Sequence, residues 1–277
     1  MTSVLVAYAA APGSVKASSW SDGFVRAVSL LAPEIESEWC NLEDPDDERH
    51  FRSKLRECDV LLTKSNWGWI VDRYVRRNTL LSRTPRTIMV SGIAPPQPWW
   101  RTKFYDVIFY QTEWYRRFLP DDRLLVHAYG TNTSFLYPRN QPGDFEWDWL
   151  CVGNIRAPKR PDMLLGKSGR RLAIGDLKQS DPALIQRLRD DGVVVRDYVP
   201  LEQLRELYWS ARRVYVPARL DGGGERQIME AVACGAEVVI EQDNPKLAEV
   251  LASTSKWTEQ YFADQLRFGL LKACGRT

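Results

Sequence analysis

The sequence has few of the residues that build metal sites and thiol sites. Its 277 residues include only two histidines, His50 and His127, which lie too far apart in the sequence to suggest a zinc pair. The five cysteines are scattered, and none of them belongs to a C-x-x-C pair. An odd number of cysteines at such spacings indicates reduced thiols rather than a disulfide framework. These shortages argue against a zinc enzyme and against a thiol catalyst.

Long apolar runs are also missing. No stretch of the sequence approaches the ~18 to 20 apolar residues that a membrane span requires. Residues 1–3 lead directly into an apolar strand pattern, which leaves no room for a charged and then apolar signal segment. We therefore expect no transmembrane segment and a cytoplasmic location, which is the host cytoplasm if the protein is viral. The sequence leaves the oligomeric state open.

One acidic motif has the spacing of a metal site. Asp44 and Asp46 form a D-x-D pair, which metal-dependent transferases of another fold use. The pair lies inside a continuous acidic run over 43–48, and no strand pattern precedes it immediately. We interpret the run as a solvated turn and predict that the protein needs no metal and no cofactor. A metal ion held by the two aspartates is the alternative.

The order of apolar patterns predicts an α/β protein. The chain is 44% hydrophobic and long enough for two cores, and short β-rich runs alternate with longer helical patterns, which is typical of parallel sheets with crossover helices. We predict strands at 4–9, 59–63, 87–90, 107–110, 149–153, 171–175, 193–195, 213–217 and 237–240. We predict helices near 20–31, 160–166, 182–190, 201–210 and 225–234, and an amphipathic tail helix over 257–271.

The most informative stretch covers residues 216–240. An apolar strand pattern runs into three consecutive glycines, a helix pattern carrying Glu230 follows, and Gly235 ends that helix before a second strand pattern. Glycines let the backbone approach a diphosphate, a helix N-terminus offers unpaired N–H groups, and a carboxylate one or two turns further on reaches ribose hydroxyls. This pattern predicts a nucleotide-linked ligand, although a glycine-rich turn is often only a tight connection.

The same stretch resembles a known donor-binding motif. The retaining, glycogen-synthase-like glycosyltransferases of the GT-B fold carry the pattern E-G-F-G-x-x-x-x-E-A-x-A-C-G-x-P-V-V, and its second half is similar to Glu230-Ala231-Val232-Ala233-Cys234-Gly235-Ala236-Glu237-Val238-Val239. The first half departs from the pattern. The family's first glutamate falls on Gly222, with Asp221 one residue early and Glu225 three residues late.

Three further stretches resemble the same family in the same order. Residues 150–162 resemble the strand, Gly-Arg turn and lysine that hold the donor diphosphate, and Lys159 has the family's spacing from Gly153. Asn154 stands at the family's arginine position, so we take Arg156 as the substitute, because a guanidinium gives the forked geometry that phosphate favours. Residues 126–138 resemble the interdomain segment. Residues 195–204 resemble the strand and loop that contact the nucleobase, with Asp197 where a glycine is usual.

The resemblance implies a fold, a domain division and a reaction. The fold is α/β of the GT-B type, with two Rossmann-like domains facing a cleft. The polar segment 141–148 is the predicted linker, which gives an acceptor-side domain over 1–143, a nucleotide-sugar-binding domain over 144–260, and a C-terminal helix over 261–277 that crosses back to the first domain. The reaction is a retaining, metal-independent transfer of a hexosyl or pentosyl group from a nucleotide sugar to a hydroxyl.

The resemblance also implies site residues. The catalytic candidates are Arg156, Lys159 and Glu230. The donor-binding candidates are Gly13, Gly153, Asn154, Tyr198, Val199, Gly222, Gly223, Gly224, Glu225 and Arg226.

The acceptor is suggested by charge. Residues 64–117 carry ten Lys or Arg against three acidic residues, a local balance of +7 in a chain of net charge +2, and many aromatic residues are interleaved with them. Such a mixture suits a phosphate backbone and an unstacked base. The favoured acceptor is a hydroxymethylated base in double-stranded phage DNA, with Arg76, Arg77, Trp99, Trp100 and Arg101 as acceptor-binding candidates.

Three alternatives remain open for this stretch and for the reaction. The aromatic residues can be core residues and the arginines a solvated face. The same mixture suits a glycan or lipid acceptor at an anionic membrane surface. Finally, the two departures from the motif are compatible with an inactive protein that only binds a nucleotide sugar.

Overall fold

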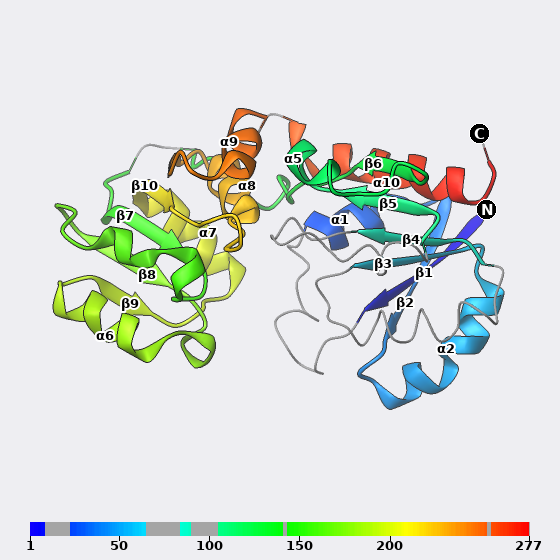
Figure 1. Ribbon diagram of the computed structural model, residues 1–277, viewed down its shortest axis with the longest axis horizontal. Helices are drawn as coiled ribbons and strands as arrows, with labels where there is room; N and C mark the ends of the chain where they lie inside the picture. The colour runs from blue at the N-terminus through cyan, green and yellow to red at the C-terminus, as the bar shows by residue number, and fades with distance from the viewer. Residues whose placement is uncertain (9–22, 65–83, 90–104, 141–142, 254–255, 277) are drawn as a thin grey trace. The chain divides into compact units, whose positions relative to one another are not determined.

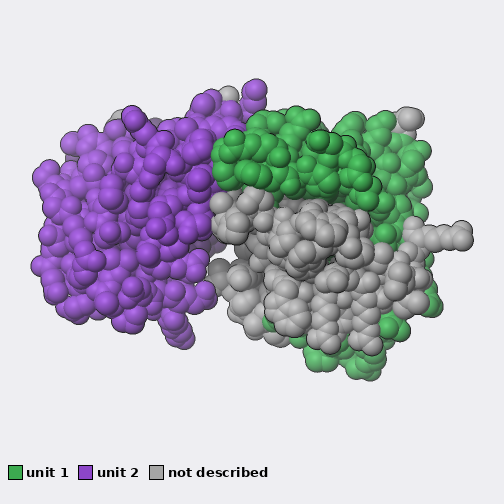
Figure 2. Space-filling view, viewed as in Figure 1, with its two compact units in different colours: residues 1–92, 96–130, 258–277 green, residues 93–95, 131–257 purple. Residues whose placement is uncertain are grey.

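The computed structural model describes residues 1–277 apart from 9–22, 65–83, 90–104, 141–142, 254–255 and 277. The described residues divide into two compact units (Figure 2). The described residues of 1–130 and 258–276 form unit 1, and those of 131–257 form unit 2.

Unit 1 is built on a six-stranded parallel sheet (Figure 1). Its strands lie in the order β2-β1-β3-β4-β5-β6. They are β1 (Thr2–Tyr8), β2 (Ile35–Asn41), β3 (Val60–Lys64), β4 (Arg86–Met89), β5 (Val107–Tyr110) and β6 (Leu124–His127), and the described helices are α1 (Gly23–Ser29), α2 (Pro45–Glu57), α5 (Glu113–Arg116) and α10 (Glu259–Ala273).

Both faces of this sheet are covered because its central strands are apolar on both sides. Val4 and Val6 of β1 belong to one core with α1 and α10, where Phe24 and Phe262 are buried. The alternate residues of the strands face a second core that includes Phe51 of α2. This arrangement follows from the period of two along a strand. The last helix of the chain therefore completes the core of the first unit.

Unit 2 is built on a five-stranded parallel sheet in the order β11-β10-β7-β8-β9. Its strands are β7 (Trp147–Val152), β8 (Arg171–Ile174), β9 (Val194–Arg196), β10 (Ala211–Val216) and β11 (Glu237–Ile240). Its helices are α6 (Pro182–Asp190), α7 (Leu201–Ser210), α8 (Glu225–Ala233) and α9 (Pro245–Ala252), and three 3₁₀ turns are η2 (Ala157–Lys159), η3 (Pro161–Leu164) and η4 (Leu177–Gln179).

The strand orders confirm the predicted α/β class with two Rossmann-like units. In unit 2 the chain winds from β7 outward through β8 and β9, then returns to the other side of β7 with β10 and β11. The order therefore reverses between β7 and β10. In doubly wound sheets, ligands bind outside the carboxyl ends of the strands at such a switch point.

Several predicted elements differ from the structure. Strands β2 and β6 and helices α2, α5 and α9 were not predicted from the sequence. The helix predicted near 160–166 is a 3₁₀ turn, η3. The acidic run is largely solvated, as predicted, since Glu43, Asp46 and Glu48 are exposed, but it is more than a turn because it opens α2. The Asp44 side chain accepts hydrogen bonds from the backbone N–H groups of Asp46 and Asp47. Carboxylates in the first turn of a helix are stabilised by its dipole, so this run has a structural explanation.

The division between the units also differs from the predicted one. The chain passes from unit 1 to unit 2 after residue 130, upstream of the predicted boundary at 143/144, and returns after 257. The reason is that the segment after residue 130 is bonded into unit 2. Arg205 Nη1 donates to the Phe135 carbonyl at 3.2 Å, and Trp209 Nε1 donates to the Tyr137 carbonyl at 2.7 Å.

Candidate functional site

Two of the predicted motifs follow the two strands at the switch point of unit 2. Residues 153–160 follow β7, and residues 217–224 follow β10. Since β7 and β10 are hydrogen-bonded neighbours in a parallel sheet, their carboxyl ends lie at the same edge. The topology therefore brings the two motifs together, and it does so at the edge where a ligand is expected.

The two loops are bonded directly to one another. The backbone N–H of Arg219 donates to the Pro158 carbonyl at 3.0 Å, and Arg160 Nε donates to the Pro217 carbonyl at 2.6 Å. Arg160 also forms two hydrogen bonds with the Asp243 carboxylate, at 2.7 and 2.8 Å. A guanidinium that bridges backbone and carboxylate in this way fixes the spacing between the loops.

Gly222 is the residue on which the family's first glutamate falls, and the structure gives it a steric role. A Cβ atom at this position would overlap the Pro158 carbonyl oxygen. The close approach of the two loops therefore requires glycine here. A glutamate side chain does not fit at this position without movement of the backbone.

Helix α8 begins at Glu225, and its N-cap residue, Gly224, has no side chain that could bond the first N–H groups. The residue before it, Gly224, has a φ of 125°, which an L-residue with a side chain rarely adopts. The first N–H groups of a helix have no partner within the helix, so an uncapped N-terminus offers them to an anion. Gly222, Gly223 and Gly224 are all buried in the loop that precedes it.

Lys159 lies beside this loop as a half-buried cation. Its Cε atom would be 3.3 Å from a Cβ at Gly153, so the glycine leaves room for the lysine stem. Within the described ranges, the Lys159 ammonium forms no hydrogen bond and no ion pair. Burial lowers the pKa of Lys159, while the negative charge of Glu225 opposes this change. A desolvated cation of this kind is stabilised by an anionic ligand.

Arg156 and Asn154 stand on the same loop. Arg156 is exposed and precedes η2, and Asn154 is half-buried. Neither side chain has a partner in the part of the chain that the structure describes. The predicted exchange of roles between these two residues is therefore compatible with their surroundings, since the guanidinium of Arg156 is accessible.

Glu230 is buried, and both oxygens of its carboxylate are engaged. Tyr208 donates its hydroxyl to Oε2 at 2.9 Å, and Arg226 donates Nε to Oε1 at 2.5 Å. Burial, followed by the charge of Glu230, raises the pKa of Tyr208 well above its ordinary value, so the phenol remains the donor of this bond. The Arg226 side chain is 42% exposed. Of the two partners of Glu230, Arg226 is therefore the one that a ligand can reach.

Glu225 faces the protein interior, although the sequence analysis placed it among the donor-binding residues. Its side chain is 5% exposed, and its Oε1 atom lies 2.9 Å from the ammonium of the fully buried Lys246. The sequence analysis did not identify Lys246 or its neighbour Asn244. The one signal for them is the pair Asn244-Pro245, which is typical of a helix start and which the structure confirms as the beginning of α9.

The loop after β9 carries the residues predicted to contact a nucleobase. Tyr198 is 44% exposed, and Val199 is half-buried. Asp197 fixes this loop to the one after β8, because its Oδ1 atom accepts from the N–H groups of Leu177 and Tyr198 at 3.1 and 2.8 Å. These two hydrogen bonds lower the pKa of Asp197. An aspartate at the position of the usual glycine therefore acts as a loop anchor.

The remaining predicted residues lie outside the described residues. They are Gly13, Arg76, Arg77, Trp99, Trp100 and Arg101. Of the aromatic residues in the basic stretch that the structure does describe, Tyr105, Phe109, Tyr110 and Tyr115 are buried in the core of unit 1. Part of this aromatic content is therefore structural.

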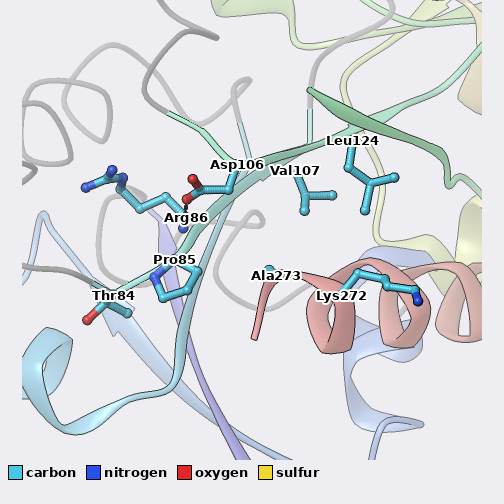
Figure 3. A pocket seen from close by; sticks show the side chains of 8 residues that line it. All are labelled: Thr84, Pro85, Arg86, Asp106, Val107, Leu124, Lys272 and Ala273. Carbon is cyan, nitrogen blue, oxygen red and sulfur yellow. Dashed lines mark hydrogen bonds between the residues drawn. The ribbon is translucent and has the colours of Figure 1, made fainter. Parts of the chain in front are cut away.

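A pocket of about 250 Å³ lies in unit 1, and none of its lining residues is a predicted site residue (Figure 3). Its lining includes the first residues of three strands, Arg86, Val107 and Leu124. The pocket thus lies at the amino edge of the sheet, whereas ligands of doubly wound sheets bind at the carboxyl edge. It lends no support to the predicted site.

Among the described residues, no group of three or more His, Cys, Asp or Glu side chains is arranged to hold a metal ion. No described helix is both long enough and apolar enough to cross a membrane.

Comparison with known proteins gives structural matches at low sequence identity. No protein-family model matches the chain, and no curated protein matches it in sequence. HepE of Anabaena, in its crystal structure with UDP-glucose, is 11% identical over 99% of this chain and 98% of HepE, with a TM-score of 0.62. A glycosyltransferase from Rickettsia africae is 10% identical over 98% of this chain and 94% of its own, with a TM-score of 0.57.

A third match is the UDP-forming α,α-trehalose-phosphate synthase of Burkholderia xenovorans. It is 10% identical over 98% of this chain and 96% of its own, with a TM-score of 0.50. At such identities the likeness shows the fold alone. The chain has the GT-B glycosyltransferase fold, with two Rossmann-like domains.

Proposed function

We propose that this chain is a retaining, metal-independent glycosyltransferase that binds a nucleotide sugar at the carboxyl ends of β7 and β10. The observation that carries the proposal is the Lys159 ammonium, half-buried and without a partner among the described residues, beside the loop that leads to the uncapped N-terminus of α8. A half-buried cation beside a helix N-terminus at a topological switch point forms a site for a diphosphate.

The same groups suit the chemistry of glycosyl transfer. When the bond between the anomeric carbon and the phosphate oxygen breaks, the electron pair remains on the nucleotide diphosphate. Lys159, Arg156 and the N–H groups of α8 stabilise this developing charge, so a metal ion is not needed for that purpose. Glu230 takes the ribose role, because a carboxylate has lone pairs beyond the two that Tyr208 and Arg226 use.

The donor side is tested by removing the unpaired cation. We expect Lys159→Ala to weaken UDP-glucose binding at least about tenfold in calorimetric titration, because a charge-assisted contact with the diphosphate is lost. UDP-glucose is the probe because the HepE structure holds it. The matched control is Lys256→Ala, which removes an exposed lysine from the same unit. Equal affinities in the wild type and both variants would exclude Lys159 from the donor site.

Hydrolysis of the nucleotide sugar distinguishes a transferase from a protein that only binds it. A transferase transfers its sugar slowly to water when no acceptor is present, whereas a sensor protein returns the nucleotide sugar intact. Release of free UDP from bound UDP-glucose, followed by chromatography, therefore distinguishes the two. A panel of nucleotide sugars extends the same assay to other donors.

The acceptor in this proposal is a hydroxymethylated base in double-stranded DNA. Its support is the +7 balance of residues 64–117, which matches a polyanion. The test is transfer of labelled sugar to DNA with 5-hydroxymethyl pyrimidines, with unmodified DNA as the control. Reversing the charges of Arg76, Arg77 and Arg101 should weaken DNA binding and leave UDP-glucose binding unchanged. Binding to anionic vesicles through these arginines, without transfer to DNA, would favour a lipid acceptor instead.

A further inference from the structure

Lys246 is an unusual residue because its side chain is completely buried and yet carries an ammonium group. It stands in the first turn of α9, directly after Pro245. Its Nζ atom donates to the Leu220 carbonyl at 2.8 Å and lies 2.9 Å from Glu225 Oε1. Lys246 is thus fixed at one point by the backbone of the glycine-rich loop, and its charge faces the first residue of α8.

Lys246 is part of a wider support for this loop. Asn244 Nδ2 donates to the Ala218 carbonyl at 2.8 Å, two residues before the carbonyl that Lys246 holds. A loop without regular structure needs such side-chain partners for its buried carbonyl groups. The start of α9 therefore determines the position of the glycine-rich loop, and with it the position of Glu225.

Glu225 interacts with two lysines, but it forms an ion pair with only one of them. The ion pair is with Lys246, whereas Lys159 experiences the negative charge of Glu225 from beyond ion-pair distance. A buried carboxylate that loses its counter-ion strongly attracts another cation. Without Lys246, Lys159 is the lysine of this cluster that remains for Glu225.

We propose that Lys246 is a positioning residue: it holds the Glu225 carboxylate in a buried ion pair and thereby leaves the Lys159 ammonium unpaired for an anionic ligand. The side chains of Lys159, Lys246 and Glu225 carry a net charge of +1. The charge that Glu225 does not compensate is on Lys159, which is only half-buried. The anion that fits this arrangement is the diphosphate of a nucleotide sugar, so the purpose of the arrangement rests on the function proposed above.

The experiment measures the pKa of Lys159 in variants that remove one or both partners of the buried ion pair. Acetic anhydride labels only neutral amines, so the pH dependence of Lys159 labelling, followed by mass spectrometry, reports this pKa. The charged and titratable groups that act on Lys159 are Glu225, Cys151, Arg156 and Lys246. Only the first and the last of these are changed in the variants.

We expect a pattern that a purely structural role of Lys246 would not produce. In Lys246→Met, the pKa of Lys159 rises, because Glu225 now pairs with it. In Glu225→Gln, the pKa of Lys159 falls below the wild-type value, because the attraction is lost and the repulsion by Lys246 remains. In the double variant K246M/E225Q, the pKa returns close to the wild-type value. A Lys159 pKa that is unchanged or lowered in Lys246→Met overturns the proposal.

The second measurement is the affinity for inorganic pyrophosphate at neutral pH. It should fall about tenfold in Lys246→Met and recover to within about threefold of wild type in the double variant, since the competing carboxylate is then absent. If Lys246→Met does not fold, Glu225→Gln and the double variant decide the question: an unchanged Lys159 pKa in Glu225→Gln overturns the proposal.

The two proposals fail in different ways. The labelling requires no donor, so absence of UDP-glucose binding by the wild type overturns the proposed function while the labelling still judges the role of Lys246. Conversely, normal UDP-glucose turnover in the wild type, with Lys159 labelling that does not respond to Lys246→Met, overturns the role of Lys246 alone.

Discussion

Two glutamates on helix α8 have opposite surroundings, although they are five residues apart. Glu225 is paired with Lys246, a side chain with no exposure, whereas Glu230 is held by buried Tyr208 and by Arg226, whose side chain is 42% exposed. Both carboxylates are buried, at 5% and 4% exposure. The difference lies in the partners, because only Glu230 has a partner that water or a ligand can replace.

Because of this difference, we assign the two glutamates of one motif different roles: Glu225 supports the loop, and Glu230 is the candidate for ligand binding. An ion pair sealed from water cannot exchange its partner for a ligand without a large desolvation penalty. A partly exposed arginine can move at little cost, since exposed ion pairs contribute about 0 to 1 kcal/mol. The buried pair thus serves the shape of the glycine-rich loop, whereas Glu230 has a partner, Arg226, that is itself partly exposed.

The comparison is tested most severely by removing the cation from each glutamate. Lys246→Met should lower the free energy of unfolding by about 3 to 5 kcal/mol, because it leaves Glu225 buried without its ion-pair partner. Arg226→Met should lower it by less than Lys246→Met does, because this arginine is partly exposed and Tyr208 still donates to Glu230. Urea unfolding of both variants gives the two values. Similar losses in both would show that the two glutamates are equivalent.

The next largest effect concerns ligand binding. Glu230→Ala should weaken UDP-glucose binding at least about tenfold, or ~1.4 kcal/mol, because the hydrogen bond that a ribose hydroxyl donates to the charged carboxylate is lost. Glu230→Gln retains an oxygen that accepts from Tyr208 and serves as the control for folding. Calorimetric titration measures both. Unchanged affinity in Glu230→Ala would remove Glu230 from the binding site.

The pH dependence of stability also distinguishes the two glutamates, because Glu230 accepts a hydrogen bond from Tyr208 and Glu225 has no such tyrosine partner among the described residues. The raised pKa means that the folded protein keeps the Tyr208 proton where the unfolded chain, with a tyrosine pKa near 10, releases it. The stability that this bond contributes is therefore present below about pH 10 and is lost as the pH rises further. Unfolding of wild type and Tyr208→Phe between pH 8 and 11 should show their difference narrowing. A constant difference would contradict the raised pKa.

Metal removal should have the smallest effect. Each glutamate already has a protein cation as its partner, Lys246 or Arg226, and in the proposed site Lys159 and Arg156 stabilise the charge on the diphosphate. We expect UDP-glucose turnover to stay within about twofold when a chelator is added, well below the tenfold that ~1.4 kcal/mol represents. Loss of turnover that manganese or magnesium restores would show that a metal takes part.

The sequence predicted the central strands of both sheets better than the edges of unit 1. The missed strands β2 and β6 are the two edges of its sheet. In β2, Glu36 and Glu38 are exposed, so the apolar run that marks a buried strand is absent. Strands buried on both faces, such as β1 and β5, have continuous apolar runs, which is why their positions were predicted within one or two residues.

Some candidate site residues could be predicted from the sequence because they lie close together along the chain. The glycines after β10, the lysine after β7 and the helix that carries Glu230 follow from local patterns, because a strand, a turn and a helix are neighbours along the chain. The same patterns were enough to predict a fold of two Rossmann-like units.

Only the tertiary structure decided which charges meet. Lys246 lies on a helix that begins two elements after the glycine-rich loop, and Arg160 reaches Asp243 across 83 positions of sequence. Such pairs form because parallel strands bring their carboxyl ends, and the loops that follow them, to one edge of the sheet. The sequence therefore predicted that Glu225 and Glu230 belong to one motif, while burial and the choice of partner determined that one supports the loop and the other faces a replaceable cation.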